Sequence, residues 1–153
     1  MSKRRLILLP TLLMLLFLLV SCYLVAGEQA ETVPMDENRP GAYTVGLVSA
    51  DGEGYRTIEA GLPSVPVIVD VSAQTEQGEL VVAVLNLDGS PVVTATARFG
   101  LQGQGKGATR TDEVGRITLR ITTAEARNGT YTVRYRLAAP LTPTPTSRPT
   151  PAP

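Results

Sequence analysis

The sequence predicts an all-β antiparallel domain over residues 41–138. Three observations predict this class: short runs rich in Val, Ile, Thr and Tyr, turn residues between the runs, and apolar residues at alternate positions within them. The runs cover residues 42–48, 55–60, 65–73, 80–87, 92–99, 108–111, 116–122 and 130–137. Short strands at this spacing are typical of a β-sandwich or a barrel of about seven or eight strands.

Turn residues separate these predicted strands. The tight-turn signals are Asp51-Gly52, Asp88-Gly89, Asp112-Glu113-Val114-Gly115 and Asn128-Gly129. Residues 100–107 read GLQGQGKG, and this glycine-rich stretch predicts a flexible loop. Residues 122–127 alone have helical character, enough for a single turn.

Alternation within the runs predicts which side chains face the core, since successive side chains of a strand point to opposite faces. The apolar sets are Val93, Ala95, Ala97 and Phe99; Ile117, Leu119 and Ile121; and Tyr131, Val133, Tyr135 and Leu137. Each of these three strands therefore has one solvated face, as antiparallel sheets allow. Residues 80–87 are apolar on both faces, which predicts a central strand.

The N-terminal segment, residues 1–26, predicts export to a membrane. Lys3, Arg4 and Arg5 precede an apolar run that extends from Leu6 to Ala26, and this charge asymmetry keeps the start of the chain in the cytoplasm. Residues 27–40 are acidic and polar and predict a linker. Residues 139–153 alternate Thr and Pro and predict a disordered, extended tail.

Leu19-Val20-Ser21-Cys22 resembles the lipobox of bacterial lipoproteins. The resemblance implies that Cys22 is diacylated and becomes the new N-terminus after cleavage. Two alternatives remain. The run to Ala26 is long enough to span a bilayer uncleaved as a helix, or cleavage near Ala26 releases the protein. We expect a signal peptide and an outward-facing protein at the cell membrane, held by a lipid or by a single N-terminal helix.

The order of turns and strands after Leu80 resembles bacterial immunoglobulin-like domains of the invasin and intimin type. The segments that carry it are Leu87-Asp88-Gly89-Ser90-Pro91-Val92, Thr111-Asp112-Glu113-Val114-Gly115-Arg116 and Asn128-Gly129-Thr130-Tyr131-Thr132-Val133. The resemblance implies an immunoglobulin-like sandwich, a turn, a hairpin and the entry to the last strand at these three places, and a display or adhesion role without catalytic residues.

Composition excludes several function classes. The chain has no histidine and a single cysteine, so the commonest general base and a thiolate metal cluster are absent. Lys106 is the only lysine after residue 26, which leaves no evident activator for a Ser or Thr nucleophile. Without Lys3, Arg4 and Arg5 the chain carries 11 basic against 14 acidic residues, which argues against nucleic acid. We expect no enzyme activity, no cofactor and no metal.

One set of residues is a candidate binding face. If the half-solvated strands share a sheet, five arginines would gather on it among threonines: Arg98, Arg116, Arg120, Arg134 and Arg136. Guanidinium groups pair with carboxylates and anionic glycans, although a solvated sheet face protected by arginine has the same pattern. The sequence thus predicts a non-catalytic binding or structural module of a bacterial cell envelope, whose partner is a cell-wall polymer or an envelope protein. The alternatives are a subunit of a membrane assembly and a carbohydrate-binding module.

Overall fold

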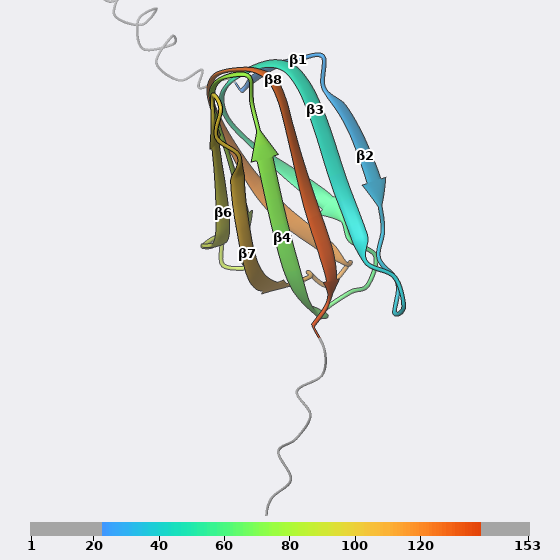
Figure 1. Ribbon diagram of the computed structural model, residues 1–153. Coiled ribbons are helices and arrows are strands. Elements are labelled where there is room, and N and C mark those ends of the chain that lie inside the picture. Colours follow the sequence, from blue (N-terminus) through green and yellow to red (C-terminus); the bar gives the residue numbers. More distant parts are fainter. Residues whose placement is uncertain (1–22, 139–153) are drawn as a thin grey trace, which may run out of the picture.

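The computed structural model describes residues 23–138, and within this range the chain forms strands only (Figure 1). Every strand pair is antiparallel, so the predicted all-β antiparallel class is confirmed. The strands are β1 (Leu24–Ala26), β2 (Gln29–Val33), β3 (Gly41–Glu59), β4 (Pro66–Gln74), β5 (Gln77–Leu85), β6 (Pro91–Arg98), β7 (Gly103–Arg110) and β8 (Arg116–Leu137). The expected N-terminal helix lies outside the described residues as far as Cys22, but its last part, Leu24–Ala26, is strand β1 and not helix. The expected Thr/Pro tail lies outside the described residues. Between Tyr23 and Ala138 there is no helix of a length and apolarity that would cross a membrane.

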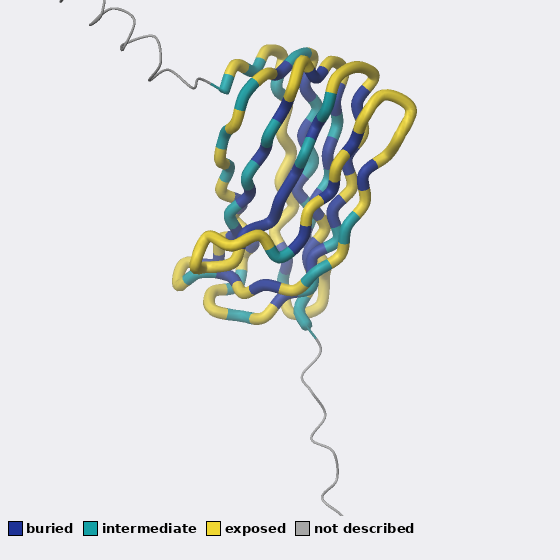
Figure 2. The backbone as a smooth tube through the Cα atoms, turned by 90° about the vertical axis from the view of Figure 1, so that its left-hand side faces the viewer, coloured by how far each residue is buried: buried dark blue, intermediate teal, exposed yellow. Residues whose placement is uncertain are grey.

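The strands form two sheets that share β3 and β8. The front sheet, which faces the viewer in Figure 1, contains β2, residues 41–50 of β3, residues 129–137 of β8, β4 and β7, in that order. The back sheet contains residues 52–59 of β3, residues 116–127 of β8, β5 and β6. Since both long strands bend over the same end of the domain, the core lies between two layers that are joined there without a loop (Figure 2).

The bends correct two predicted turns. Asp51-Gly52 lies inside β3, where the register with β8 shifts between Ala50 and Gly52. Gly52 has a φ of 104°, and in β8 Asn128 has a φ of 48°. These residue types favour turns because they tolerate positive φ, and a strand that passes from one sheet to the other needs the same backbone freedom. The predicted helical turn at residues 122–127 is also strand.

The predicted linker at residues 27–40 belongs to the folded domain, so this boundary was wrong. Strand β2 pairs along the edge of the front sheet from Gln29 to Val33. The Tyr135 hydroxyl donates a hydrogen bond of 2.9 Å to the Val33 carbonyl oxygen. Met35 is buried, and its N–H donates to the Ala60 carbonyl oxygen at 2.8 Å. The polar composition of this segment did not indicate a strand. A strand at a sheet edge is held by backbone hydrogen bonds and needs few apolar side chains.

The residues just before β2 form a strap, defined here as Tyr23 to Glu28, that covers one open side of the sandwich. Strand β1 pairs with Ser49 to Asp51, and Tyr23 packs against the core. The Arg56 guanidinium lies 5.2 Å from the centre of the Tyr23 ring. Arg56 also donates to both carboxylate oxygens of Glu28, at 3.2 and 2.7 Å. This bidentate pair fixes the strap to β3.

The predicted core faces are confirmed except at two residues, of which Leu137 is only partly buried. Ile117, Leu119 and Ile121, Tyr131, Val133 and Tyr135, and Val93, Ala95 and Ala97 are all buried. Strand β5 lies between β6 and β8, as its apolar character predicted. Phe99, in contrast, is 77% exposed. It continues the alternation of β6 but lies one residue beyond the end of that strand, in the turn that leads to β7.

Candidate ligand-binding face

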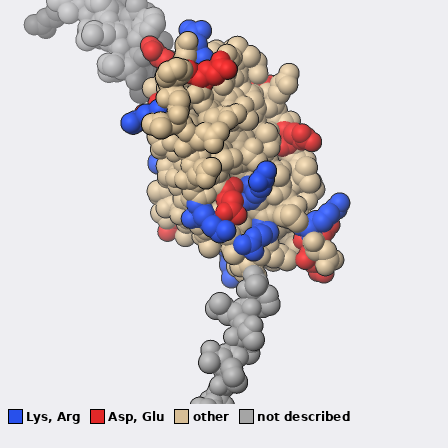
Figure 3. Space-filling model, viewed as in Figure 1, with Lys and Arg blue, Asp and Glu red and all other residues tan. Residues whose placement is uncertain are grey.

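The outer surface of the front sheet carries a continuous set of polar side chains from β3, β4, β7 and β8. We call it the polar face, and its residues are Thr44, Asp70, Ser72, Gln74, Gln104, Lys106, Thr130, Thr132, Arg134 and Arg136. In Figure 3 basic side chains surround an acidic one on the lower part of this surface, uncharged residues cover the part above them, and further charged groups lie at the top edge of the domain. The face is therefore a hydrogen-bonding surface with its charge concentrated in one region.

A row of charged residues crosses this face. Asp70 of β4 is the register partner of Lys106 on β7 and of Arg134 on β8, so its carboxylate stands between two cations. Lys106 Nζ lies 3.3 Å from Asp70 Oδ1, and both side chains are substantially exposed. With Ser72 and Gln104 these three residues line an open groove. An exposed pair of this kind contributes little to stability, so its charges are free to interact with a ligand.

Glycines on the inward side of β7 position this row. Gly103, Gly105 and Gly107 alternate with the outward side chains of Gln104 and Lys106. A Cβ at Gly103 would lie 2.5 Å from the Thr96 carbonyl carbon, and one at Gly105 would lie 2.6 Å from a Val93 methyl group. Strand β7 thus rests directly on β6, where the two sheets meet. The flexible loop predicted for residues 100–107 was wrong for this reason: the glycines permit a close approach of two strands.

The five candidate arginines do not share one face. Arg134 and Arg136 lie on the polar face, whereas Arg98, Arg116 and Arg120 lie on the back sheet. The bend of β8 causes this separation, because it sends the two halves of one strand into different sheets. Arg98 is also bound to Glu79, with Nε 2.6 Å from Oε2. The groove residues Asp70 and Lys106 did not appear in the predicted set.

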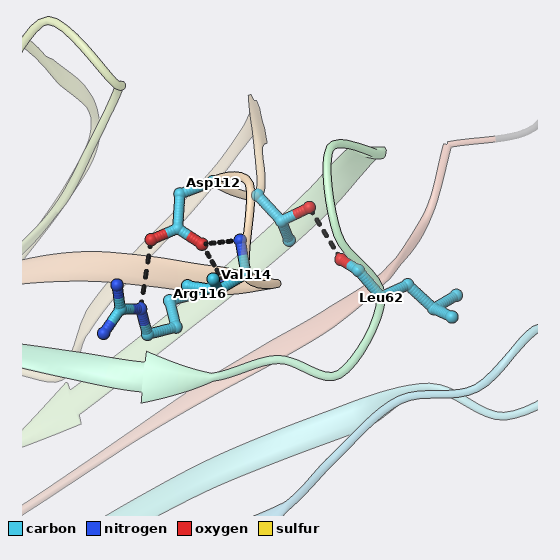
Figure 4. Close-up of polar contacts among 5 residues, drawn as sticks. Leu62, Asp112, Val114 and Arg116 are labelled. Atoms are coloured by element: carbon cyan, nitrogen blue, oxygen red, sulfur yellow. Dashed lines mark hydrogen bonds and ion pairs between the residues drawn. The ribbon is translucent and has the colours of Figure 1, made fainter.

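Arg116 takes part in a turn (Figure 4). Asp112 Oδ1 accepts hydrogen bonds from the N–H groups of Val114 at 3.0 Å and Arg116 at 2.8 Å, and Oδ2 accepts from Arg116 Nε at 3.1 Å. The backbone N–H of Arg116 contributes most to holding the pKa of the Asp112 carboxyl below its usual value. The Thr111 hydroxyl donates to the Leu62 carbonyl oxygen at 2.8 Å. This turn joins β7 of the front sheet to β8 of the back sheet, rather than closing the hairpin that the resemblance implied.

The interior offers no comparable site among the described residues. Every buried side-chain nitrogen or oxygen of this region has a hydrogen-bond partner, and no three acidic or thiol groups of it are close enough to hold a metal ion. Burial raises the pKa of Tyr135 to about 12, and it also raises the pKa of Tyr131. These tyrosines are neutral core residues near pH 7, so the groove on the polar face is the candidate site.

The fold and this site define an antiparallel β-sandwich domain with a polar, grooved outer face. No family model matches the chain, and no curated protein matches it.

Several solved structures are similar to it. The CBM22-1-GH10 modules of the Clostridium thermocellum xylanase 10B are 18% identical, with 76% of this chain and 26% of that chain covered and a TM-score of 0.41. A carbohydrate-binding module of Cellvibrio mixtus lichenase 5A is 16% identical, with 75% and 90% covered and a TM-score of 0.36. The xylan-binding CBM22-1 domain of Paenibacillus barcinonensis Xyn10C is 8% identical, with 77% and 86% covered and a TM-score of 0.37. The chain spans about a quarter of the first of these proteins. Similarities this distant carry no argument about its ligand.

Proposed function

We propose that the protein is a non-catalytic binding module, held at the outer surface of a bacterial cell membrane, whose polar face binds a hydroxyl-rich polymer of the envelope. The observation that carries the proposal is the charged row in the groove. Asp70 offers acceptor oxygens between the donors Lys106 and Arg134, while Ser72 and Gln104 add neutral groups of both kinds. Alternating donors and acceptors suit the hydroxyl and carboxylate groups of a polysaccharide.

The groove has a particular chemical character. It contains no aromatic side chain, so a sugar ring would be held by hydrogen bonds and charge rather than by stacking. Such a site favours a polymer that carries anionic groups, which Lys106 and Arg134 can pair. This supports a cell-wall or other envelope polymer as the partner, ahead of a neutral glucan or xylan. The immunoglobulin-like assignment stays a prediction from the sequence.

The start of the domain supports lipid attachment at Cys22 as the means of retention. Tyr23 packs on the core and Leu24 begins β1, so cleavage near Ala26 would remove part of the fold. A membrane-spanning helix would have to end by Cys22, and a helix from Leu6 to that point measures about 26 Å, at the short limit of what spans the ~30 Å of a bilayer core. A diacylated Cys22 needs no such length.

The binding proposal is tested by retention of the full chain, in detergent, on isolated bacterial cell wall. We expect Lys106→Gln combined with Arg134→Gln to lower retention at least about tenfold, because two charge-assisted hydrogen bonds are lost. Arg120→Gln is the matched control, since Arg120 lies on the outer surface of the back sheet. Equal retention of both variants and the unchanged chain would overturn the binding site. One stoichiometric crosslinked protein, with no wall binding, would favour a subunit of an assembly.

A further inference from the structure

The turn between β6 and β7 carries Phe99, which is the most exposed large hydrophobic residue that the structure describes. Arg98 and Leu101 close a hairpin through two backbone hydrogen bonds of 3.1 and 2.8 Å, with Phe99 and Gly100 at its tip. Phe99 is 77% exposed and Leu101 68%. Gly100 has the positive φ of 74° that the turn requires, but nothing in the turn requires Phe99. Two large apolar side chains exposed in one turn indicate a surface that meets another apolar phase.

This turn lies at the same end of the domain as the start of the described chain. Leu101 lines a hollow with Thr75 and Glu76 of the β4–β5 connection, and Leu24 lines a second hollow with Gln77 and Gly78, the first residues of β5. Leu24 is also 68% exposed. Figures 1 and 2 show the described chain beginning at this end and ending at the opposite one. We call the set Leu24, Phe99 and Leu101 the apolar tip.

The strap leaves little distance between the domain and the lipid proposed on Cys22. The Arg56–Glu28 pair and the packing of Tyr23 fix the strap to the core. Successive Cα atoms are about 3.8 Å apart, so a lipid on Cys22 would begin two residues before Leu24 of the apolar tip. A domain attached this closely stands on the bilayer rather than on a flexible stalk.

We propose that the apolar tip contacts the bilayer surface, with Phe99 and Leu101 at the boundary between headgroups and acyl chains. The inference rests on the membrane attachment proposed above. Lipid is the expected partner because the described chain begins at this end, and the 22 residues that precede it in the sequence contain the apolar run from Leu6. This contact sets the orientation of the domain. The long axis of the sandwich is perpendicular to the membrane, and the groove of the polar face is on the side of the domain, open to a polymer above the membrane.

Charge at this end argues for apolar rather than electrostatic contact. The acidic residues around the tip are Asp51, Glu76, Glu79 and Glu125, and the basic ones are Arg98 and Arg127. The balance is acidic, so anionic lipids would not attract this end. We therefore expect the contact to form with zwitterionic phosphatidylcholine at least as well as with phosphatidylglycerol.

The absence of tryptophan from the chain gives a direct test. The full chain, with the N-terminus its host gives it, is purified from bacterial membranes and reconstituted in phosphatidylcholine vesicles that contain brominated acyl chains. Phe99→Trp places a single tryptophan at the tip, and Leu101→Trp is a second reporter in the same turn. Val114→Trp is the matched control, because Val114 is a 62% exposed residue of the turn before β8, and the start of β8 lies at the opposite end of the domain from its bend. Flotation of the vesicles measures membrane attachment in the same samples.

We expect bromine to reduce the tip tryptophan emission at least about twofold, as for side chains that reach the headgroup boundary, and to leave the control unchanged. Protein that floats with the vesicles but shows equal quenching at both positions would overturn the tip contact and leave membrane attachment intact. A blue-shifted tip emission that bromine does not quench would show that protein covers the tip, and would overturn the contact too. Protein that does not float would overturn both proposals.

Discussion

The close packing of β7 against β6 depends on the glycines of β7, and Gly103→Ala tests this packing directly. An added Cβ would lie 2.5 to 2.6 Å from three backbone atoms of Thr96. Ordinary contact begins near 3.4 Å, so the two strands must separate by ~0.8 Å. Overpacking of this kind costs about 1–3 kcal/mol. We expect the upper half of that range, because the obstructing atoms are backbone atoms of a paired strand.

Gly46→Ala is the matched control for this variant. Gly46 lies in a strand of the same sheet, has no atom within 4 Å of the added Cβ, and is not among the residues with positive φ. Its replacement should not destabilise the protein and should raise its stability by at most about 1 kcal/mol, because alanine restricts the unfolded chain more than glycine does.

Urea unfolding of the full chain in detergent, followed by far-ultraviolet circular dichroism, measures both variants. With a denaturant dependence of about 1–3 kcal/mol per molar urea, Gly103→Ala should lower the midpoint by about 1 M. A difference of less than about 0.5 kcal/mol between the two variants would refute the close seating of β7. If the reasoning holds, displacement of β7 also moves Lys106 away from Asp70, so wall retention should fall in Gly103→Ala but not in Gly46→Ala.

Two further predictions concern groups between the sheets and at the strap. The pKa of Tyr135 is raised by burial to about 12 from 10, so the folded state favours the neutral phenol; stability is complete below about pH 10 and falls between about pH 10 and 12. Near pH 8, Tyr135→Phe should be about 1 kcal/mol less stable than the unchanged chain, because it lacks the hydrogen bond to Val33. When unfolding is repeated near pH 11, the free energy of unfolding should fall by less in Tyr135→Phe than in the unchanged chain. An equal fall in both proteins would mean that another group titrates. Glu28→Gln should cost about 1–2 kcal/mol in urea unfolding, since it weakens the bidentate pair with Arg56, whose side chain is 30% exposed. A coupling energy near zero in a double-mutant cycle with Arg56→Gln would mean that this pair does not hold the strap.

The all-β class was predictable because alternation is local. Each of the buried sets, such as Ile117, Leu119 and Ile121, is visible within a few residues and needs no knowledge of its partners. The bends were not predictable in the same way. Gly52 and Asn128 supply a positive φ, and the same chemistry serves a turn that reverses the chain and a bulge that redirects a strand. Which of the two forms depends on pairing partners distant in the sequence.

Prediction of the groove would also have required the pairing of strands that are distant in the sequence. Arg134 was predicted as a binding residue from its own strand. Asp70 and Lys106 join it only because three strands pair in one register, and register is a property of the whole sheet. One local signal was present: Asp70 falls at an outward position of the run that contains Val69 and Val71, so a charge within a half-buried strand marked the face.

The pairing of β2 and β8 on either side of β3 has a mechanical consequence. A pull between Tyr23 and Ala138, the two ends of the described chain, acts nearly along the last part of β8 and along β2, in opposite directions. The hydrogen bonds that tie β2 and β8 to β3 then carry the force together, in shear, instead of opening one after another. A module stretched between a membrane and a wall polymer would resist extension best in this orientation.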